Sequence, residues 1–287
     1  MVKVIKNYQD NEALRHSFNQ LAKMTFGISF EDWYQNGYWT DSYIPYSMVH
    51  HGEVIANVSV NRTSFLLDKE KKVFIQLGTV MTKEGYRNQG FIRKLMLEID
   101  KDFSGVEGIY LFANDSVLDF YPKFGFKMVR EFQYYKSVDN PNEMTISRVP
   151  MNNKKDWHAL ERILKQKKPL GNFELIDNIG LIMFYVTKFM QTNVYYEKSL
   201  KAYVISEVNG SELFIHGVFS EEKIQLDEII KAFGNTIKRV TLGFVPDEGE
   251  GFLSMIKKEK NTTLFVKGKL FDIFSEQRLM FPTLSHA

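Results

Sequence analysis

Residues 73–97 restrict the fold more than any other part of the sequence, because a strand, a glycine turn and a helix follow one another there. The run 73–81 (VFIQLGTVM) is rich in β-branched and other apolar residues, which predicts a strand. Apolar residues recur at helical spacing between Phe91 and Ile99, which predicts a helix that begins just after Gly90. The first amides of such a helix have no intrahelical acceptor, and the positive end of the helix dipole lies behind them. The turn is therefore predicted to bind an anion, and phosphate is the natural occupant.

Composition limits the class of protein. A chain of 287 residues is long enough for two domains of roughly 140 residues, each with its own core. The chain is 25% charged and 44% hydrophobic, which is typical of folded globular proteins. The net charge of +2 gives no basis for nucleic-acid binding by a whole surface, so anion recognition is expected to be local.

Cysteine, signal and membrane patterns narrow the setting. The chain has no cysteine, which excludes disulfides, thiolate metal ligands and a cysteine nucleophile and fits a reducing compartment. The start MVKVIKN lacks the apolar core of a signal peptide. The apolar run 179–190 contains Lys188 and is too short to span a bilayer, so it is predicted to be a buried helix. We expect a cytoplasmic protein with neither a membrane partner nor a metal.

The patterns along residues 1–137 predict one α/β (α+β) domain. Two helices open it, and three antiparallel strands follow. After the glycine-turn helix comes a buried strand that should lie parallel to the strand before that helix. The expected strands are 46–50, 54–64, 73–81, 108–113, 124–129 and 132–136.

A second domain is predicted after a polar linker at residues 138–143 (VDNPNE), which breaks both periodicities. Residues 144–287 repeat the order of elements, and FIQLGTV at 74–80 has a weak echo in FIHGV at 214–218. This echo indicates duplication, with chance similarity of two apolar strands as the alternative. In place of the glycine turn the second half has Ser-Glu-Glu-Lys at 220–223, whose carboxylates would repel phosphate. Only the first half is therefore expected to bind a phosphorylated cofactor.

Two common phosphate-binding motifs do not fit the turn. Gly85 and Gly90 match the glycines of a P-loop, but Phe91 and Ile92 stand where that motif requires Lys and Ser or Thr. No GxGxxG follows the first strand, which argues against a Rossmann dinucleotide site.

The run Arg87-Asn88-Gln89-Gly90-Phe91-Ile92 resembles the pyrophosphate loop of the GCN5-related N-acetyltransferases (GNAT), written Gln/Arg-x-x-Gly-x-Gly/Ala. Ile92 stands where that pattern has a small residue. A larger aliphatic residue at this position is similar to the sequences of the Eis-like branch of the family. Residues 121–126 (YPKFGF) resemble the family's Tyr-x-x-x-Gly-Phe segment. The resemblance implies tandem GNAT-like domains, each a mixed, mostly antiparallel twisted sheet flanked by helices.

The resemblance implies acetyl-CoA as cosubstrate and a set of residues that bind it. Backbone groups at the end of the predicted strand 73–81 would hold the thioester and the pantetheine arm. The loop that contains Gly90 would wrap the pyrophosphate. Tyr121 would donate a proton to the leaving thiolate, because a phenol with a pKa near 10 is protonated at neutral pH. The implied acetyl-CoA contacts are Val80, Met81, Thr82, Arg87, Asn88, Gln89, Gly90, Phe91, Ile92, Arg93 and Asn114.

For the acceptor, the resemblance points to the aromatic residues around the opening helices, including Phe26, Trp33 and Tyr38. Aromatic walls suit amphipathic or cationic amines, and ordinary core packing is the alternative. No general base stands out. In the Eis-like branch the C-terminal carboxylate can reach the active site, so the carboxylate of Ala287 is a candidate to hold or deprotonate the amine.

The resulting hypothesis is an N-acetyltransferase that moves an acetyl group to a primary amine of a small molecule or peptide, by direct attack in a ternary complex. One alternative is a non-catalytic protein that binds or senses acyl-CoA. Another is a tandem acyltransferase that uses aminoacyl-tRNA. The intact Arg-x-x-Gly turn favours CoA over RNA.

Overall fold

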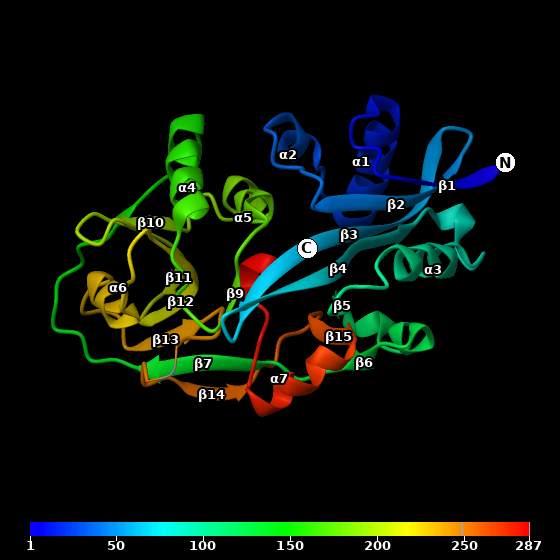
Figure 1. Ribbon diagram of the computed structural model, residues 1–287. Helices are drawn as coiled ribbons and strands as arrows, with labels where there is room; N and C mark the ends of the chain where they lie inside the picture. The colour runs from blue at the N-terminus through cyan, green and yellow to red at the C-terminus, as the bar shows by residue number, and fades with distance from the viewer. Residues whose placement is uncertain (248, 287) are drawn as a thin grey trace.

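The computed structural model describes residues 1–247 and 249–286, which form two mixed sheets side by side (Figure 1). The sheet that contains most of the first half has the order β1-β2-β3-β4-β5-β15-β6, and a further strand, β9, pairs with β3. Its strands are β1 (Val2–Lys6), β2 (Tyr43–His50), β3 (Glu53–Leu67), β4 (Glu70–Thr82), β5 (Gly108–Ala113), β6 (Lys127–Met128), β9 (Phe173–Leu175) and β15 (Thr263–Lys267).

The second sheet has the order β8-β10-β11-β12-β13-β7-β14, which repeats the first sheet position by position. In each sheet one parallel pair stands at the centre: β4 with β5, and β12 with β13. The predicted echo lies on β4 and β12, so the prediction of a duplicated fold is confirmed. The strands are β7 (Phe132–Ser137), β8 (Ser147–Arg148), β10 (Val194–Glu197), β11 (Ala202–Asn209), β12 (Glu212–Phe219), β13 (Arg239–Leu242) and β14 (Leu253–Ile256).

Helices cover both faces of the first sheet. Phe18 and Leu21 of α1 pack in one hydrophobic core, and Leu95 and Ile99 of α3 pack in another on the opposite face. The side chain of Asn11 caps α1 by accepting a hydrogen bond from Leu14 N, at 3.1 Å. The helices are α1 (Glu12–Phe26), α2 (Glu31–Gln35), α3 (Phe91–Asp102), α4 (Lys154–Gln166), α5 (Ile179–Phe184), α6 (Leu226–Ala232) and α7 (Ile273–Glu276).

Short helical turns supplement these elements, and one of them has π geometry. The π-helical turn Tyr185–Phe189 continues directly from α5. The 3₁₀ turns are Glu84–Tyr86, Asp115–Val117, Tyr121–Phe124, Lys269–Asp272 and Thr283–Ser285. No helix among residues 1–247 and 249–286 is both long enough and apolar enough to cross a membrane.

The two sheets exchange their penultimate strands, which the sequence analysis did not predict. The strand expected at 132–136 was placed in the first sheet, and this placement is wrong, because β7 pairs with β13 and β14 of the second sheet. Strand β15, from the far end of the chain, takes the vacant position between β5 and β6 (Figure 1). Because both sheets have the same strand order, β7 and β15 occupy equivalent positions and form the same kind of backbone hydrogen bonds. Local sequence patterns therefore do not distinguish the two pairings. The limits 1–137 and 144–287 stay a prediction for the domains, but neither stretch completes its sheet alone.

A buried ion pair lies where the two exchanged segments cross. Glu131 follows β6 and Lys257 follows β14, and Lys257 N donates to Glu131 O at 2.8 Å. The Lys257 ammonium lies 3.5 Å from the Glu131 carboxylate, and both side chains are at most 5% exposed. The same carboxylate accepts a hydrogen bond from Phe281 N at 2.8 Å. Burial raises the pKa of Glu131, and the nearby Lys257 charge opposes that rise.

We expect Glu131→Ala to lower the free energy of unfolding by about 1–3 kcal/mol, because the buried Phe281 N loses its acceptor, while Lys257 keeps Glu259 at 3.1 Å. Urea denaturation followed by circular dichroism measures the change. Glu222→Ala is the matched control, because Glu222 pairs with Lys201 where both side chains are about 70% exposed. Such exposed pairs contribute at most about 1 kcal/mol. Equal effects of the two substitutions would contradict the assigned role.

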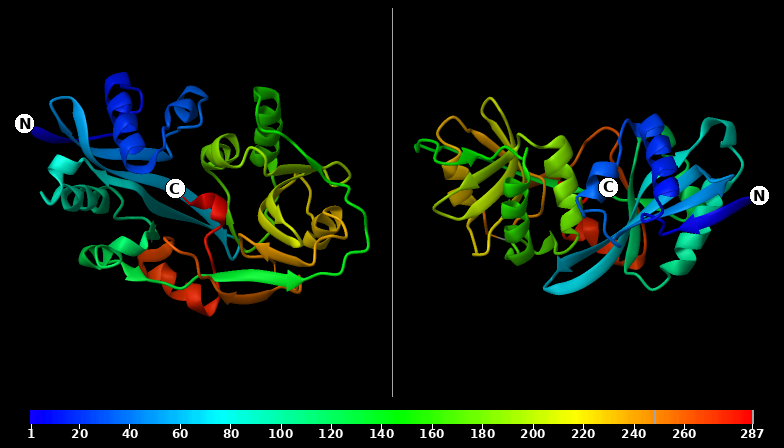
Figure 2. Two further views of the ribbon diagram at one scale, coloured as in Figure 1. Left: turned by 180° about the vertical axis from the view of Figure 1, so that it is seen from behind. Right: turned by 90° about the horizontal axis from the view of Figure 1, so that it is seen from above.

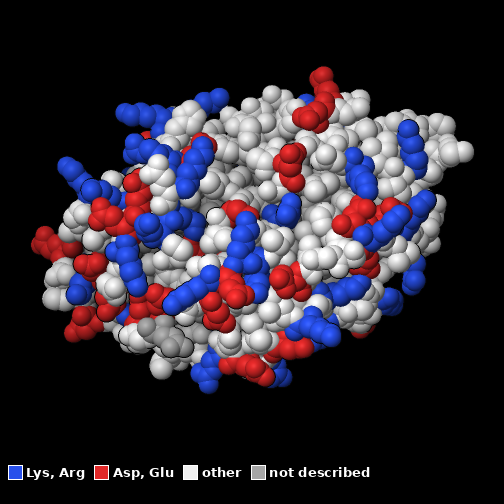
Figure 3. Space-filling view, viewed as in Figure 1, with Lys and Arg blue, Asp and Glu red and all other residues white. Residues whose placement is uncertain are grey.

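The C-terminal tail is part of the core that joins the halves. The ring of Phe281 stacks on Tyr110 of β5 with centroids 3.8 Å apart, and Phe173 and Phe274 contact it from other elements. In Figures 1 and 2 the turn Thr283–Ser285, at the red end of the ribbon, lies between the two sheets. On the face shown in Figure 3, acidic and basic side chains are interspersed and neither sign dominates.

Candidate active site

A groove opens where β4 and β5 separate. Their parallel pairing covers only Phe74–Gln76 and Gly108–Tyr110, although both strands continue beyond it. The groove has a volume of about 720 Å³ and runs from this separation to the start of α3. Its walls therefore include backbone of β4 that the neighbouring strand β5 does not pair with, as the sequence analysis expected for the pantetheine arm.

A β-bulge bends β4 beside the groove. The register between β3 and β4 shifts between Asn57 and Ser59, and Thr79 has a φ of 49°. This conformation is rare for a β-branched residue and costs on the order of 1–3 kcal/mol. The buried amide of Asn57 donates to Thr79 O at 2.9 Å, and the Thr79 and Tyr43 hydroxyls lie 2.6 Å apart. These contacts fix the point where the groove meets a second cavity.

The glycine turn has the geometry of an anion site. Gly90 is the N-cap of α3 with a φ of 76°, and a Cβ added there would meet no atom within 4 Å. The first intrahelical bond runs from Lys94 N to Gly90 O at 3.1 Å. The preceding amides of the first turn consequently have no helical acceptor and are available to a ligand. Asn88 supports the turn with a φ of 62°.

The structure brings all the predicted cofactor residues to this one groove. Asn114 directly precedes the turn Asp115–Val117, and its side chain makes no capping hydrogen bond with the described residues. The predicted residues that line the groove are Val80, Met81, Thr82, Arg87, Asn88, Gln89, Gly90, Phe91, Ile92, Arg93, Asn114 and Tyr121.

Tyr121 lies on the groove wall at the start of its 3₁₀ turn and is only 6% exposed. Its ring packs against Phe120 and Phe126, and also against Phe265 of the exchanged strand β15. Burial raises the pKa of Tyr121 to about 12, so the phenol keeps its proton throughout the physiological range. The group is suited to donate a proton and not to accept one.

A second, aromatic cavity of about 250 Å³ adjoins the groove. Thr79 and Phe26 line both cavities, so the two lie next to each other. Trp33 also lines the aromatic cavity, as predicted, whereas Tyr38 lies outside the lining of both. Burial, with the carboxylate of Glu161 beside the hydroxyl, raises the pKa of Tyr38 to about 12. Tyr38 thus faces α4 of the second half.

The second half supplies residues of this aromatic cavity that the sequence analysis missed. The π-helical turn is closed by a bond from Met190 N to Tyr185 O at 2.9 Å, and both Tyr185 and Phe189 line the cavity. The Tyr185 hydroxyl donates to His286 O at 2.6 Å, and the His286 ring stacks on Phe112 with centroids 3.7 Å apart. A π-helical turn has no clear sequence pattern, and the apolar tail was the one available signal. Ala287, whose carboxylate is the predicted base, lies outside the described residues.

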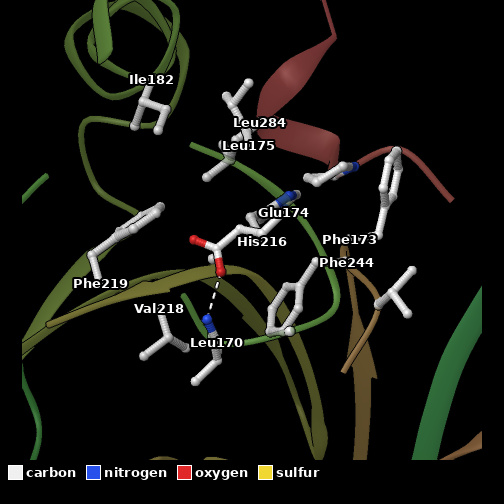
Figure 4. A pocket seen from close by; sticks show the side chains of 14 residues that line it. Leu170, Phe173, Glu174, Leu175, Ile182, His216, Val218, Phe219, Phe244 and Leu284 are labelled. Carbon is white, nitrogen blue, oxygen red and sulfur yellow. Dashed lines mark hydrogen bonds between the residues drawn. The ribbon is translucent and has the colours of Figure 1, made fainter. Parts of the chain in front are cut away.

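The equivalent gap in the second sheet is filled. Strands β12 and β13 also separate, after Ile215 and Leu242, but the space between them is reduced to about 40 Å³. Figure 4 shows side chains of the 170–175 segment and Leu284 of the tail gathered around it. Thr283 N donates to Gly243 O at 2.8 Å, which ties the tail into the gap. This gap leaves no room for a cofactor arm. It holds the C-terminal tail, whose residue His286 lines the aromatic cavity beside the first site.

The fold and site together define a transferase class, in which a phosphate-binding helix start and a split parallel strand pair bound one groove. Residues 11–126 match the model of the acetyltransferase (GNAT) family. The first half of the chain thus carries a domain of the GNAT family, and the second half has a GNAT-like fold in tandem with it. Comparison with curated proteins gave no match.

Solved structures share this fold over nearly the whole chain. A probable N-acyltransferase of unknown function from Enterococcus faecalis has a TM-score of 0.59 and 14% identity, covering 96% of this chain and 74% of its own. Eis1 from Mycobacterium abscessus has a TM-score of 0.54 and 12% identity, covering 92% of this chain and 73% of its own. A GCN5-related N-acetyltransferase from Kribbella flavida has a TM-score of 0.53 and 11% identity, covering 93% and 70%. At these identities the likeness is one of fold.

Proposed function

We propose that the protein transfers an acetyl group from acetyl-CoA to a primary amine of a small molecule or peptide by direct attack in a ternary complex. The carrying observation is that two spaces adjoin: the groove runs from the Gly90 turn to Tyr121, and the aromatic cavity shares Thr79 and Phe26 with its wall. Two substrates in these two spaces meet beside the bulge of β4. Acetyl-CoA is the cosubstrate that membership of the acetyltransferase family implies.

Different residues bind the cofactor and supply the proton in the proposed reaction. The amides that begin α3, with the charges of Arg87 and Arg93, hold the pyrophosphate. Backbone groups of Val80 and Met81 hold the arm and the thioester in the separated strands. The amine nitrogen forms a C–N bond to the acetyl carbon, the C–S bond breaks, and Tyr121 gives the departing sulfur its proton. The nitrogen releases one proton to the solvent and the Tyr121 phenolate takes one up, so that one amide and one thiol are formed and Tyr121 is again protonated.

Two measurements test this proposal. Calorimetry with coenzyme A should show one site per chain, and no heat of association would overturn the proposal. Thiol release from acetyl-CoA should then depend on added amine, with an N-acetylated product of the expected mass. Binding of CoA without amine-dependent thiol release from any amine would instead identify a non-catalytic acyl-CoA-binding protein.

A further inference from the structure

We infer that the acceptor is a small primary monoamine with an aromatic or other apolar body, which lies in the aromatic cavity with its nitrogen directed to Thr79. This inference rests on the acetyl transfer proposed above, and it selects one class of acceptor for the same site. The selection comes from the lining of the cavity, its charge and its size.

The lining is apolar on every side. Rings from α2, β2 and the turn after α5 face the cavity, and the rings of Phe30 and Phe184 stack with centroids 5.3 Å apart at an angle of 2°. The mouth is apolar as well, because Phe26 and Phe189 line it and are 42% and 53% exposed. The described lining residues are Phe26, Ile28, Phe30, Trp33, Tyr43, Thr79, Leu181, Phe184, Tyr185, Phe189 and His286.

Most polar atoms on the wall already have partners, and His286 Nε2 is the exception among the described lining residues, since it is buried without one. Trp33 Nε1 donates to Gly180 O at 2.7 Å, and the hydroxyl of Tyr43 is paired with that of Thr79 at 2.6 Å. The Tyr185 hydroxyl donates to His286 O at 2.6 Å. A sugar amine would bury several hydroxyls without partners, at a cost of about 1–3 kcal/mol each. An apolar body avoids this cost.

The charge around the cavity disfavours polyamines. No Asp or Glu occurs among its lining residues in the described part of the chain, and the ammonium of Lys188, next in sequence to the lining residue Phe189, donates to Ser29 O at 2.8 Å. Burial lowers the pKa of His286 well below its usual value and raises that of Tyr43 to about 12, so both groups are neutral. Burial among neutral groups also favours the uncharged, nucleophilic form of the amine.

The size agrees with a small acceptor. The cavity of about 250 Å³ lies just below the range of roughly 300–1,000 Å³ that is usual for ligand sites. A single aromatic ring with a short amine arm suits this space better than an aminoglycoside or a peptide side chain with its flanking backbone.

The test compares acceptors by thiol release from acetyl-CoA. We expect kcat/KM for 2-phenylethylamine and tryptamine to exceed that for spermidine and kanamycin by at least 10-fold. Phe189→Asp should reduce kcat/KM for 2-phenylethylamine about 10-fold and raise that for 1,6-diaminohexane. Met24→Ser is the control, because Met24 is 70% exposed and lines neither cavity.

The outcomes separate this inference from the proposed function. Equal or better turnover of spermidine or kanamycin would overturn the inference and leave acetyl transfer intact. Calorimetric binding of coenzyme A with no turnover of the aromatic amines would also overturn it. If coenzyme A does not bind, the proposed function fails and the inference falls with it.

Discussion

Gly90→Asp is expected to abolish measurable binding of coenzyme A. The substituted carboxylate would stand at the N-cap of α3, in the groove that the pyrophosphate is proposed to occupy. Two like charges 4 Å apart at an effective dielectric constant of 20 repel by about 4 kcal/mol, which corresponds to about 10³ in Kd. Calorimetry with coenzyme A measures the loss.

Gly90→Asn is the matched control for that substitution. Asn has nearly the same shape as Asp and tolerates the positive φ of 76° that residue 90 adopts. A Cβ at this position has open space around it, so neither variant should clash. Binding that is retained by the Asn variant and lost by the Asp variant assigns the effect to charge. Equal affinity of the two variants would argue that no phosphate group lies at this turn.

Tyr121→Phe is expected to lower kcat by about 10²–10⁴, the usual contribution of a general acid, with little change in coenzyme A affinity. The phenylalanine ring keeps the contacts with Phe120, Phe126 and Phe265, so the groove wall should hold its shape. Thiol release under saturating amine measures kcat, and calorimetry measures binding. Tyr135→Phe is the control, because Tyr135 lies on β7 of the second sheet and lines neither cavity.

The pH dependence gives a second test of the same residue. Burial raises the pKa of Tyr121 to about 12, so the phenol stays protonated below that pH. Any rise of activity between pH 7 and 10 should therefore come from deprotonation of the amine, and the profile should show no loss from Tyr121 in this interval.

A kcat of the Tyr121→Phe variant within threefold of the parent would show that Tyr121 does not donate the proton.

Local patterns in the sequence were enough to predict the cofactor groove. The strand before Gly90, the turn and α3 are contiguous, so the residues that line most of the groove are close in the chain and carry a recognisable motif. The duplicated order of strands was predicted for the same reason, because each parallel pair repeats a short apolar run. Strand β1 was missed, since its five residues alternate without a strong apolar face.

The acceptor cavity was predicted only in part, because half of its wall comes from distant residues. Phe26 and Trp33 belong to the opening helices, but Phe184, Phe189 and His286 reach the cavity through tertiary packing. The exchange of β7 and β15 was likewise invisible to local patterns, since both strands fit either ladder. The sequence has no feature that specifies which of two equivalent ladders a strand joins.

The position of β15 has a consequence for biosynthesis. A ribosome releases β5 and β6 long before residues 263–267, so the first sheet of a nascent chain lacks a strand between them until β15 emerges. Such long-range pairing slows folding, and unpaired strand edges invite aggregation in the meantime. A chain cut short before β15 would therefore leave β5 and β6 unpaired, and β5 is one of the two strands that border the groove.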